Sequence, residues 1–138
     1  MPARTIVLVA CAAHKLARRA PARKLYVSDL FQKSLAYAES LHPDAIYILS
    51  AKHGLLPLEQ EIEPYNVTLN DMGREARRQW AQGVLAQLGR VADTQHDRFV
   101  ILAGVKYRSD LTPGLAHVEV PMKGLPIGKQ LQWLGEHT

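Results

Sequence analysis

The chain has 138 residues, of which 47% are hydrophobic and 22% charged, and its formal net charge is +4. This length suits one core and this composition is ordinary for a globular protein, which excludes a disordered chain and predicts a single α/β domain over residues 1–138. No apolar run approaches the roughly 20 residues of a membrane span, and the single cysteine excludes an internal disulfide. We therefore expect a cytoplasmic protein with no membrane partner, and the excess of positive charge favours an anionic one.

The amino-terminal third predicts a strand, a basic loop and a helix. Residues 5–11 (TIVLVAC) form a continuous apolar run rich in β-branched side chains, which is typical of a buried, central strand. Residues 15–24 then carry five Lys or Arg side chains and no acidic one. An amphipathic helix follows over residues 28–41, with Ser28 or Asp29 as its cap.

Residues 45–50 predict a second buried strand, which gives way abruptly to Lys52, His53 and Gly54. Glycine reaches backbone conformations that are closed to other residues, so Gly54 allows a sharp turn and close approach of a ligand. In open parallel α/β sheets, ligands bind at the carboxyl ends of strands. Lys52 and His53 are therefore candidate functional residues, although a strand followed by a solvated loop has the same pattern.

The remainder predicts two further strands and three helical segments after a long polar connection, which is usually functional or mobile. The connection covers residues 55–73, the helical segments residues 74–91 and 127–134 and a short helix or turn at 109–115 that Pro113 and Gly114 interrupt. The strands cover residues 98–103 and 117–121, the last at an edge. Strands that alternate with helices predict a three-layer αβα fold with a mostly parallel four-stranded sheet. The carboxyl ends of all four strands then lie at one edge.

A lysine follows each predicted strand; the four are Lys15, Lys52, Lys106 and Lys123. Converging ammonium groups, beside exposed backbone N–H groups at glycines such as Gly54 and Gly104, suit a phosphate or another anion. The sequence therefore predicts a phosphate-bearing ligand, either a nucleotide or a nucleic acid, at this edge.

Three tyrosines, Tyr26, Tyr65 and Tyr107, are candidates to stack on a base, although each also fits a half-buried core position. Cys11 is either a buried filler or a thiol activated by its basic neighbours. The spacing of cysteine and histidine fits no common metal motif, and residues 124–130 depart from a phosphate-binding P-loop. We expect no metal and no cofactor.

Several blocks together resemble a family of small bacterial and phage proteins of unknown function. They are Cys11-x3-Lys15, Leu25-Tyr26-x-Ser28-x2-Phe31, Tyr47-Ile-Leu-Ser50-Ala-Lys52-His53-Gly54-Leu55, Pro64-Tyr65 and Leu69. More distantly, the Leu-Ser…Gly-Leu block followed by Pro-Tyr is similar to the peroxide-stress protein YaaA family. The Cys-x3-Lys block with Tyr-x-Ser downstream is similar to the core of archaeosine synthase, which has a uracil-DNA-glycosylase-like fold, although Phe31 replaces a histidine of that motif. These resemblances imply an α/β fold and a base-containing ligand, to which Ser28 and Ser50 would contribute contacts.

We therefore expect an enzyme that cleaves an N-glycosidic bond or modifies a base, in nucleic acid or in a nucleotide. The lysines would hold phosphate, the tyrosines the base, and Lys52, His53 and Cys11 would carry the chemistry. His53, with its pKa lowered by adjacent Lys52, would act as a general base. The alternatives are a non-catalytic DNA-binding module for stress or phage defence, and a nucleotide-sensing domain; product formation distinguishes the enzyme from both.

Overall fold

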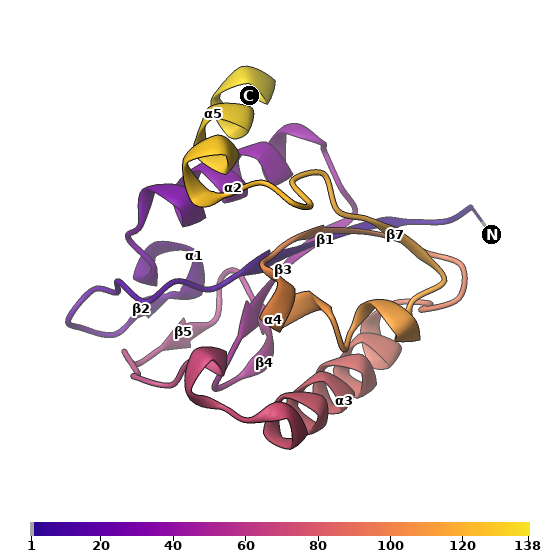
Figure 1. Cartoon of the computed structure of the whole chain (residues 1–138), viewed down its shortest axis with the longest axis horizontal. Coiled ribbons are helices and arrows are strands. Elements are labelled where there is room, and N and C mark those ends of the chain that lie inside the picture. Colours follow the sequence, from indigo (N-terminus) through magenta and orange to yellow (C-terminus); the bar gives the residue numbers. More distant parts are fainter. Residues whose placement is uncertain (1) are drawn as a thin grey trace.

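The structure is a computed structural model that describes residues 2–138, and a five-stranded sheet lies at its centre (Figure 1). The strand order is β4-β3-β1-β6-β7. The strands are β1 (Thr5–Ala10), β3 (Ala45–Ser50), β4 (Gly54–Pro57), β6 (Arg98–Leu102) and β7 (His117–Glu119). Four of them run parallel, and β4 runs antiparallel to β3 at one edge. The mostly parallel sheet, the central first strand and the edge position of residues 117–119 are therefore confirmed.

The additional strand, β4, corrects the prediction of four strands. Gly54 has φ of +70°, and the chain turns back there so that Ser50 pairs with Gly54 and Leu49 with Leu55. Leu55 and Leu56 are buried in this hairpin. The apolar pair Leu55-Leu56 is too short to predict a strand from the sequence. These residues form a strand because they pair with β3.

Helices cover both faces of the sheet, as expected for three layers (Figure 1). On one face, Val7 and Val9 of β1 share a core with α2 (Asp29–Ser40) and α5 (Ile127–His137). On the other face, the alternate β1 residues Ile6 and Leu8 share a core with α3 (Arg74–Val91). The apolar run of β1 is therefore explained by burial on both faces.

Helix boundaries follow the sequence closely except after β6. The Oγ atom of Ser28 accepts a hydrogen bond of 3.2 Å from the backbone N–H of Phe31, which caps α2. The short helix or turn predicted over residues 109–115 is the 3-10 turn η2 (Thr112–Gly114), and a single helical turn that was not predicted, α4 (Val105–Arg108), precedes it directly after β6. Pro113 lacks an N–H group, so a regular helix does not pass through it.

A small antiparallel pair joins the basic loop to the acidic part of the long connection. β2 (Ala20–Pro21) pairs with β5 (Glu61–Ile62), and the short helix α1 (Ala22–Leu25) and the 3-10 turn η1 (Leu69–Asp71) complete the elements. The Nη1 atom of Arg19 lies 3.5 Å from Oε1 of Glu63, and the Nη2 atom of Arg23 lies 3.0 Å from Oε2 of Glu39. Acidic side chains therefore balance part of the positive charge of the basic loop.

None of the helices formed by residues 2–138 combines the length and the apolar character needed to cross a bilayer.

Candidate functional site

Two of the four predicted lysines meet at one aromatic ring beside the carboxyl ends of β1 and β3. The Nζ atom of Lys15 lies 4.5 Å from the ring centroid of Tyr65, and the Nζ atom of Lys52 lies 6.0 Å from the same centroid. These distances fall in the range of cation–π contacts. Tyr65, which comes from the long connection, thus gathers the loops that follow two strands.

A chain of hydroxyl groups fixes the position of Tyr65. Its hydroxyl oxygen lies 2.5 Å from that of Tyr26 and 2.8 Å from Oγ of Ser50. Ser50 Oγ also accepts a hydrogen bond of 3.0 Å from the backbone N–H of His53. Burial raises the pKa of Tyr26 to about 12 and also raises the pKa of Tyr65, so both phenols stay protonated near neutral pH.

The hydroxyl chain changes the roles expected of two residues. Tyr26 and Ser50 are both 0% exposed, so neither reaches a ligand in this structure. Tyr26 therefore takes the core position that was the alternative to stacking on a base. Both side chains instead hold Tyr65, which is partly exposed.

His53 is half-buried behind Tyr65, and the two rings meet edge to face with centroids 5.5 Å apart. The Nε2 atom of His53 is buried and has no hydrogen-bond partner among residues 2–138. Burial, and secondly the charge of Lys52, lower the pKa of His53. The expected direction of the shift is therefore found, with burial as the larger cause.

Gln87 of α3 holds the turn that carries His53, a role that the sequence did not predict. Its Oε1 atom accepts a hydrogen bond of 2.9 Å from the backbone N–H of Leu55, and its Nε2 atom donates one of 3.4 Å to the carbonyl of His53. A Cβ atom added at Gly54 would overlap Gln87 Oε1. Gly54 is thus required both by its positive φ and by the close approach of Gln87.

A cavity of about 220 Å³, which we name the Cys11 cavity, opens beside these residues. It is lined by Cys11, Ala12, Ala13, Lys15, Asn66, Val67, Thr68, Asn70 and Tyr107. His53 and Lys52 are not among its lining residues. Three of the lining residues, Cys11, Lys15 and Tyr107, were candidates from the sequence. The fold brings them together from the segments that follow β1 and β6.

Within this cavity the thiol of Cys11 contacts a phenol. Cys11 Sγ lies 3.4 Å from the hydroxyl oxygen of Tyr107, whose ring meets Trp80 edge to face at a centroid distance of 5.6 Å. Burial, followed by the nearby sulfur, raises the pKa of Tyr107. The phenol is thus protonated near neutral pH and can donate its hydrogen to the sulfur.

The cavity also contains two amide side chains, Asn66 and Asn70, that sequence reasoning missed. Neither makes a side-chain hydrogen bond within residues 2–138, so both amides are available to a ligand. The only sequence signal for these two residues was the concentration of polar residues around Tyr65 in the long connection. That signal does not indicate which polar side chains face Cys11.

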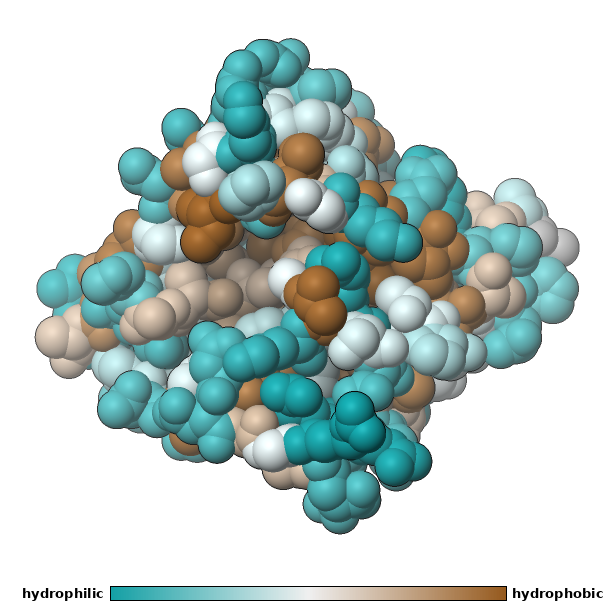
Figure 2. All heavy atoms as spheres, viewed as in Figure 1, coloured by the Kyte–Doolittle hydropathy of each residue, from teal (hydrophilic) through white to brown (hydrophobic). Residues whose placement is uncertain are grey.

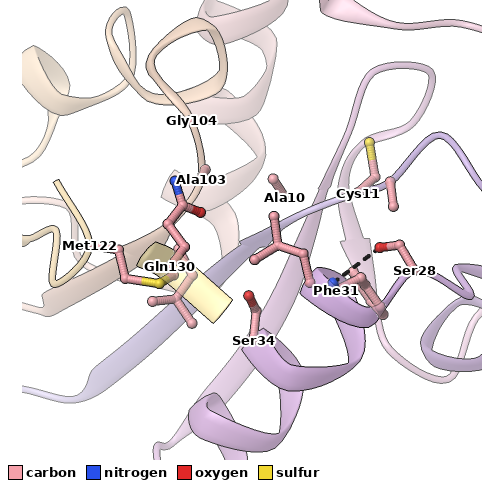
Figure 3. A pocket seen from close by; sticks show the side chains of 12 residues that line it. Ala10, Cys11, Ser28, Phe31, Ser34, Ala103, Gly104, Met122 and Gln130 are labelled. Atoms are coloured by element: carbon pink, nitrogen blue, oxygen red, sulfur yellow. Dashed lines mark hydrogen bonds between the residues drawn. The ribbon is translucent and has the colours of Figure 1, made fainter. Parts of the chain in front are cut away.

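A smaller hollow of about 70 Å³, which we name the Ser34 pocket, adjoins the Cys11 cavity (Figure 3). Its lining includes Cys11, Ser28, Ser34, Gly104 and Gln130. Cys11 and Ala12 line both spaces. Figure 2 shows a recess at this end of the sheet, between α4 and the side of the molecule formed by α2 and α5.

Lys106 and Lys123 do not join this site. Both are exposed, neither makes an ion pair or a side-chain hydrogen bond within the described chain, and neither lines the Cys11 cavity or the Ser34 pocket. Lys123 follows β7, two strands away from β1, and Lys106 precedes the inward-facing Tyr107 on α4. All four lysines follow parallel strands, as expected, but only Lys15 and Lys52 share contact with the Tyr65 ring.

No group of three or more His, Cys, Asp or Glu side chains in residues 2–138 is placed to hold a metal ion.

No curated protein and no solved structure is significantly similar to the chain. The model of one family of unknown function, DUF6884, matches residues 6–136, a span that contains both spaces and the hydroxyl chain. The chain therefore belongs to the DUF6884 family.

Proposed function

We propose that this protein is an enzyme that acts on a nucleobase, in a nucleotide or in nucleic acid, with the base bound in the Cys11 cavity. The observation that carries the proposal is the composition of this cavity: a thiol, an ammonium and a phenol lie together with two unpaired amides. Sites for drug-sized ligands occupy roughly 300–1,000 Å³. A cavity of about 220 Å³ suits one planar ring system better than a larger ligand.

The amides of Asn66 and Asn70 would recognise the edge of the base. An amide side chain presents both a donor and an acceptor, and asparagine and glutamine are common partners of base edges. Lys15 would hold negative charge on the substrate from the cavity wall.

Cys11 is the reactive group in this proposal, because its thiol lines both adjoining spaces. After the thiol gives its proton to solvent, its sulfur would attack the sugar carbon that carries the base; the bond from that carbon to the base nitrogen breaks, and the base leaves with the bonding electron pair and takes up a proton from solvent. Tyr107 would donate a hydrogen bond in the cavity, and Lys15 would stabilise the developing negative charge. N-glycosidic cleavage and base modification both fit this set. Lys52 and His53, expected at the centre of the chemistry, contact the ring of Tyr65 and do not line the Cys11 cavity; a neutral His53 would accept a proton in a supporting role.

A purely electrostatic DNA-binding module receives less support from the arrangement of charges. The ion pairs of Arg19 and Arg23 with glutamates neutralise part of the basic loop. Binding that depends on phosphate contacts needs free cationic side chains.

The experiment is incubation of the protein with the common nucleotides, with single- and double-stranded oligonucleotides and with transfer RNA, followed by mass spectrometry of released and modified bases. We expect a product that depends on the cavity: Cys11→Ser should lower its rate by about 100-fold or more, since a hydroxyl is a far weaker nucleophile. Lys15→Gln should also slow the reaction, whereas the matched variant Lys33→Gln on the exposed side of α2 should not.

The absence of product from every substrate, or a Cys11→Ser protein with the wild-type rate, would contradict the proposal. Tight nucleotide binding without product would instead support the nucleotide-sensing function.

A further inference from the structure

The Ser34 pocket lies at the amino-terminal end of α2, a helix of 12 residues. Ser28, Leu30 and Phe31 from the start of this helix contribute to its lining. The Phe31 N–H group is bonded to Ser28 Oγ, whereas the N–H group of Leu30 has no acceptor among residues 2–138. Unpaired N–H groups and the helix dipole favour negative charge at such an end.

A second feature of the pocket, independent of the helix end, is the hydroxyl of Ser34. This residue is only 4% exposed as a whole, its hydroxyl oxygen is not fully enclosed, and no side-chain hydrogen bond of Ser34 forms within the described chain. Figure 3 shows the hydroxyl pointing into the space between Phe31 and Gln130. A serine hydroxyl both donates and accepts a hydrogen bond, so this group is free to bond a molecule in the pocket.

The other polar side chains of the lining are uncharged, and Gln130 carries an acceptor oxygen as well as donor hydrogens. Gln130 Nε2 donates a hydrogen bond of 2.7 Å to the carbonyl of Leu125 and carries a second hydrogen. The Cys11 thiol lies on the wall shared with the Cys11 cavity. Asp29 adds an opposing negative charge in the first turn of α2, but its side chain is exposed and does not line the pocket. This lining suits a ligand that brings acceptor oxygens.

We infer that the Ser34 pocket binds the phosphoryl group of a nucleotide whose base occupies the Cys11 cavity; this inference rests on the proposed function. The two volumes support this assignment. The Ser34 pocket, with about 70 Å³, suits a compact phosphoryl group, and the Cys11 cavity, with about 220 Å³, suits a base. The phosphate would thus be held by a helix end and a serine rather than by Lys106 and Lys123. Cys11, between the two spaces, would face the part of the nucleotide that joins base to phosphate.

The test is titration of the full chain with inorganic phosphate, followed by calorimetry and by NMR of the backbone amides of α2. We expect saturable shifts at Leu30 and Ser34. Ser34→Ala should weaken phosphate binding about tenfold, because a hydrogen bond to a charged group is lost. Asp29→Asn should strengthen binding about two- to fivefold, since it removes a negative charge near the helix end.

Ser40→Ala is the matched control on the same helix, because Ser40 is exposed and its hydroxyl donates to the carbonyl of Tyr37 at 2.6 Å. It should leave phosphate binding unchanged. A second titration compares nucleosides with their monophosphates. The monophosphates should bind more tightly, and Ser34→Ala should remove that advantage without affecting the nucleosides.

Two results would overturn the inference: no shift at the start of α2 on addition of phosphate, which leaves the pocket to water, or equal phosphate affinity of Ser34→Ala and the wild type. Nucleoside binding that persists in either case would leave the proposed function intact. Conversely, Ser34-dependent phosphate binding without any nucleoside binding would contradict the base site and retain the phosphoryl site.

Discussion

Tyr65→Phe removes the central hydroxyl of the chain that joins Tyr26 to Ser50. The fully buried Tyr26 hydroxyl has Tyr65 as its main hydrogen-bond partner and Ser50 as a weaker one, so the substitution leaves it poorly paired. An unsatisfied buried polar group costs about 1–3 kcal/mol of the free energy of unfolding. Ser50 keeps its bond to the His53 N–H group and adds little to this cost.

Tyr26→Phe should cost less, about 0.5–1.5 kcal/mol, because the Tyr65 hydroxyl keeps Ser50 as a partner. The double substitution leaves no phenol unpaired. Its cost should therefore fall below the sum of the two single costs by about 1 kcal/mol, which is the coupling expected between directly bonded side chains.

The assay is urea denaturation of the four proteins, monitored by circular dichroism. With a slope of roughly 2 kcal/mol per molar urea, Tyr65→Phe should lower the midpoint by about 0.5–1.5 M. Additive single costs, or a larger cost for Tyr26→Phe than for Tyr65→Phe, would refute the hydroxyl chain as the element that positions Tyr65.

Two further predictions concern the turn after β3. The lowered pKa of His53 means that the unfolded chain binds a proton at higher pH than the folded chain, so the contribution of His53 to stability is present above about pH 6.5 and declines as the pH falls below it. Lys52→Gln should raise the pKa of His53 without restoring its ordinary value, because the ring stays buried. NMR titration of the imidazole measures this pKa. An unchanged titration midpoint would show that the charge of Lys52 does not affect His53. Gly54→Ala should destabilise the protein by about 2 kcal/mol or more, since it places a side chain at positive φ and displaces Gln87. The control Gly89→Ala, in α3 with open space around it, should stabilise by about 0.5–1 kcal/mol, and equal denaturation midpoints for the two variants would contradict the role given to Gln87.

Most elements were predictable because their apolar periodicity is local information. Residues 6–10 and 99–102 are continuous apolar runs, which are typical of strands buried on both faces. The apolar residues of α3 recur with the helical period between Arg74 and Val91. The alternation of strands and helices also predicted a parallel sheet and a shared carboxyl edge. These properties depend on neighbours within one segment of chain.

β4 and α4 were not predictable in the same way. Leu55 and Leu56 form a pattern too short to indicate a strand, and only pairing with β3 orders them. Lys106 and Tyr107 are adjacent in the chain and equally plausible as site residues from the sequence. The single turn of α4 leaves one exposed and places the other beside Cys11.

The sequence by itself determined the family, the layered α/β architecture and a set of candidate side chains at the strand ends. Only the tertiary structure decided which of them meet: Cys11 with Tyr107, Lys15 and Lys52 with Tyr65, and Ser34 with a pocket. The physical reason is that side-chain encounters depend on the packing of segments far apart in the chain. The contact of Cys11 with Tyr107 spans 96 residues, and no local pattern encodes it.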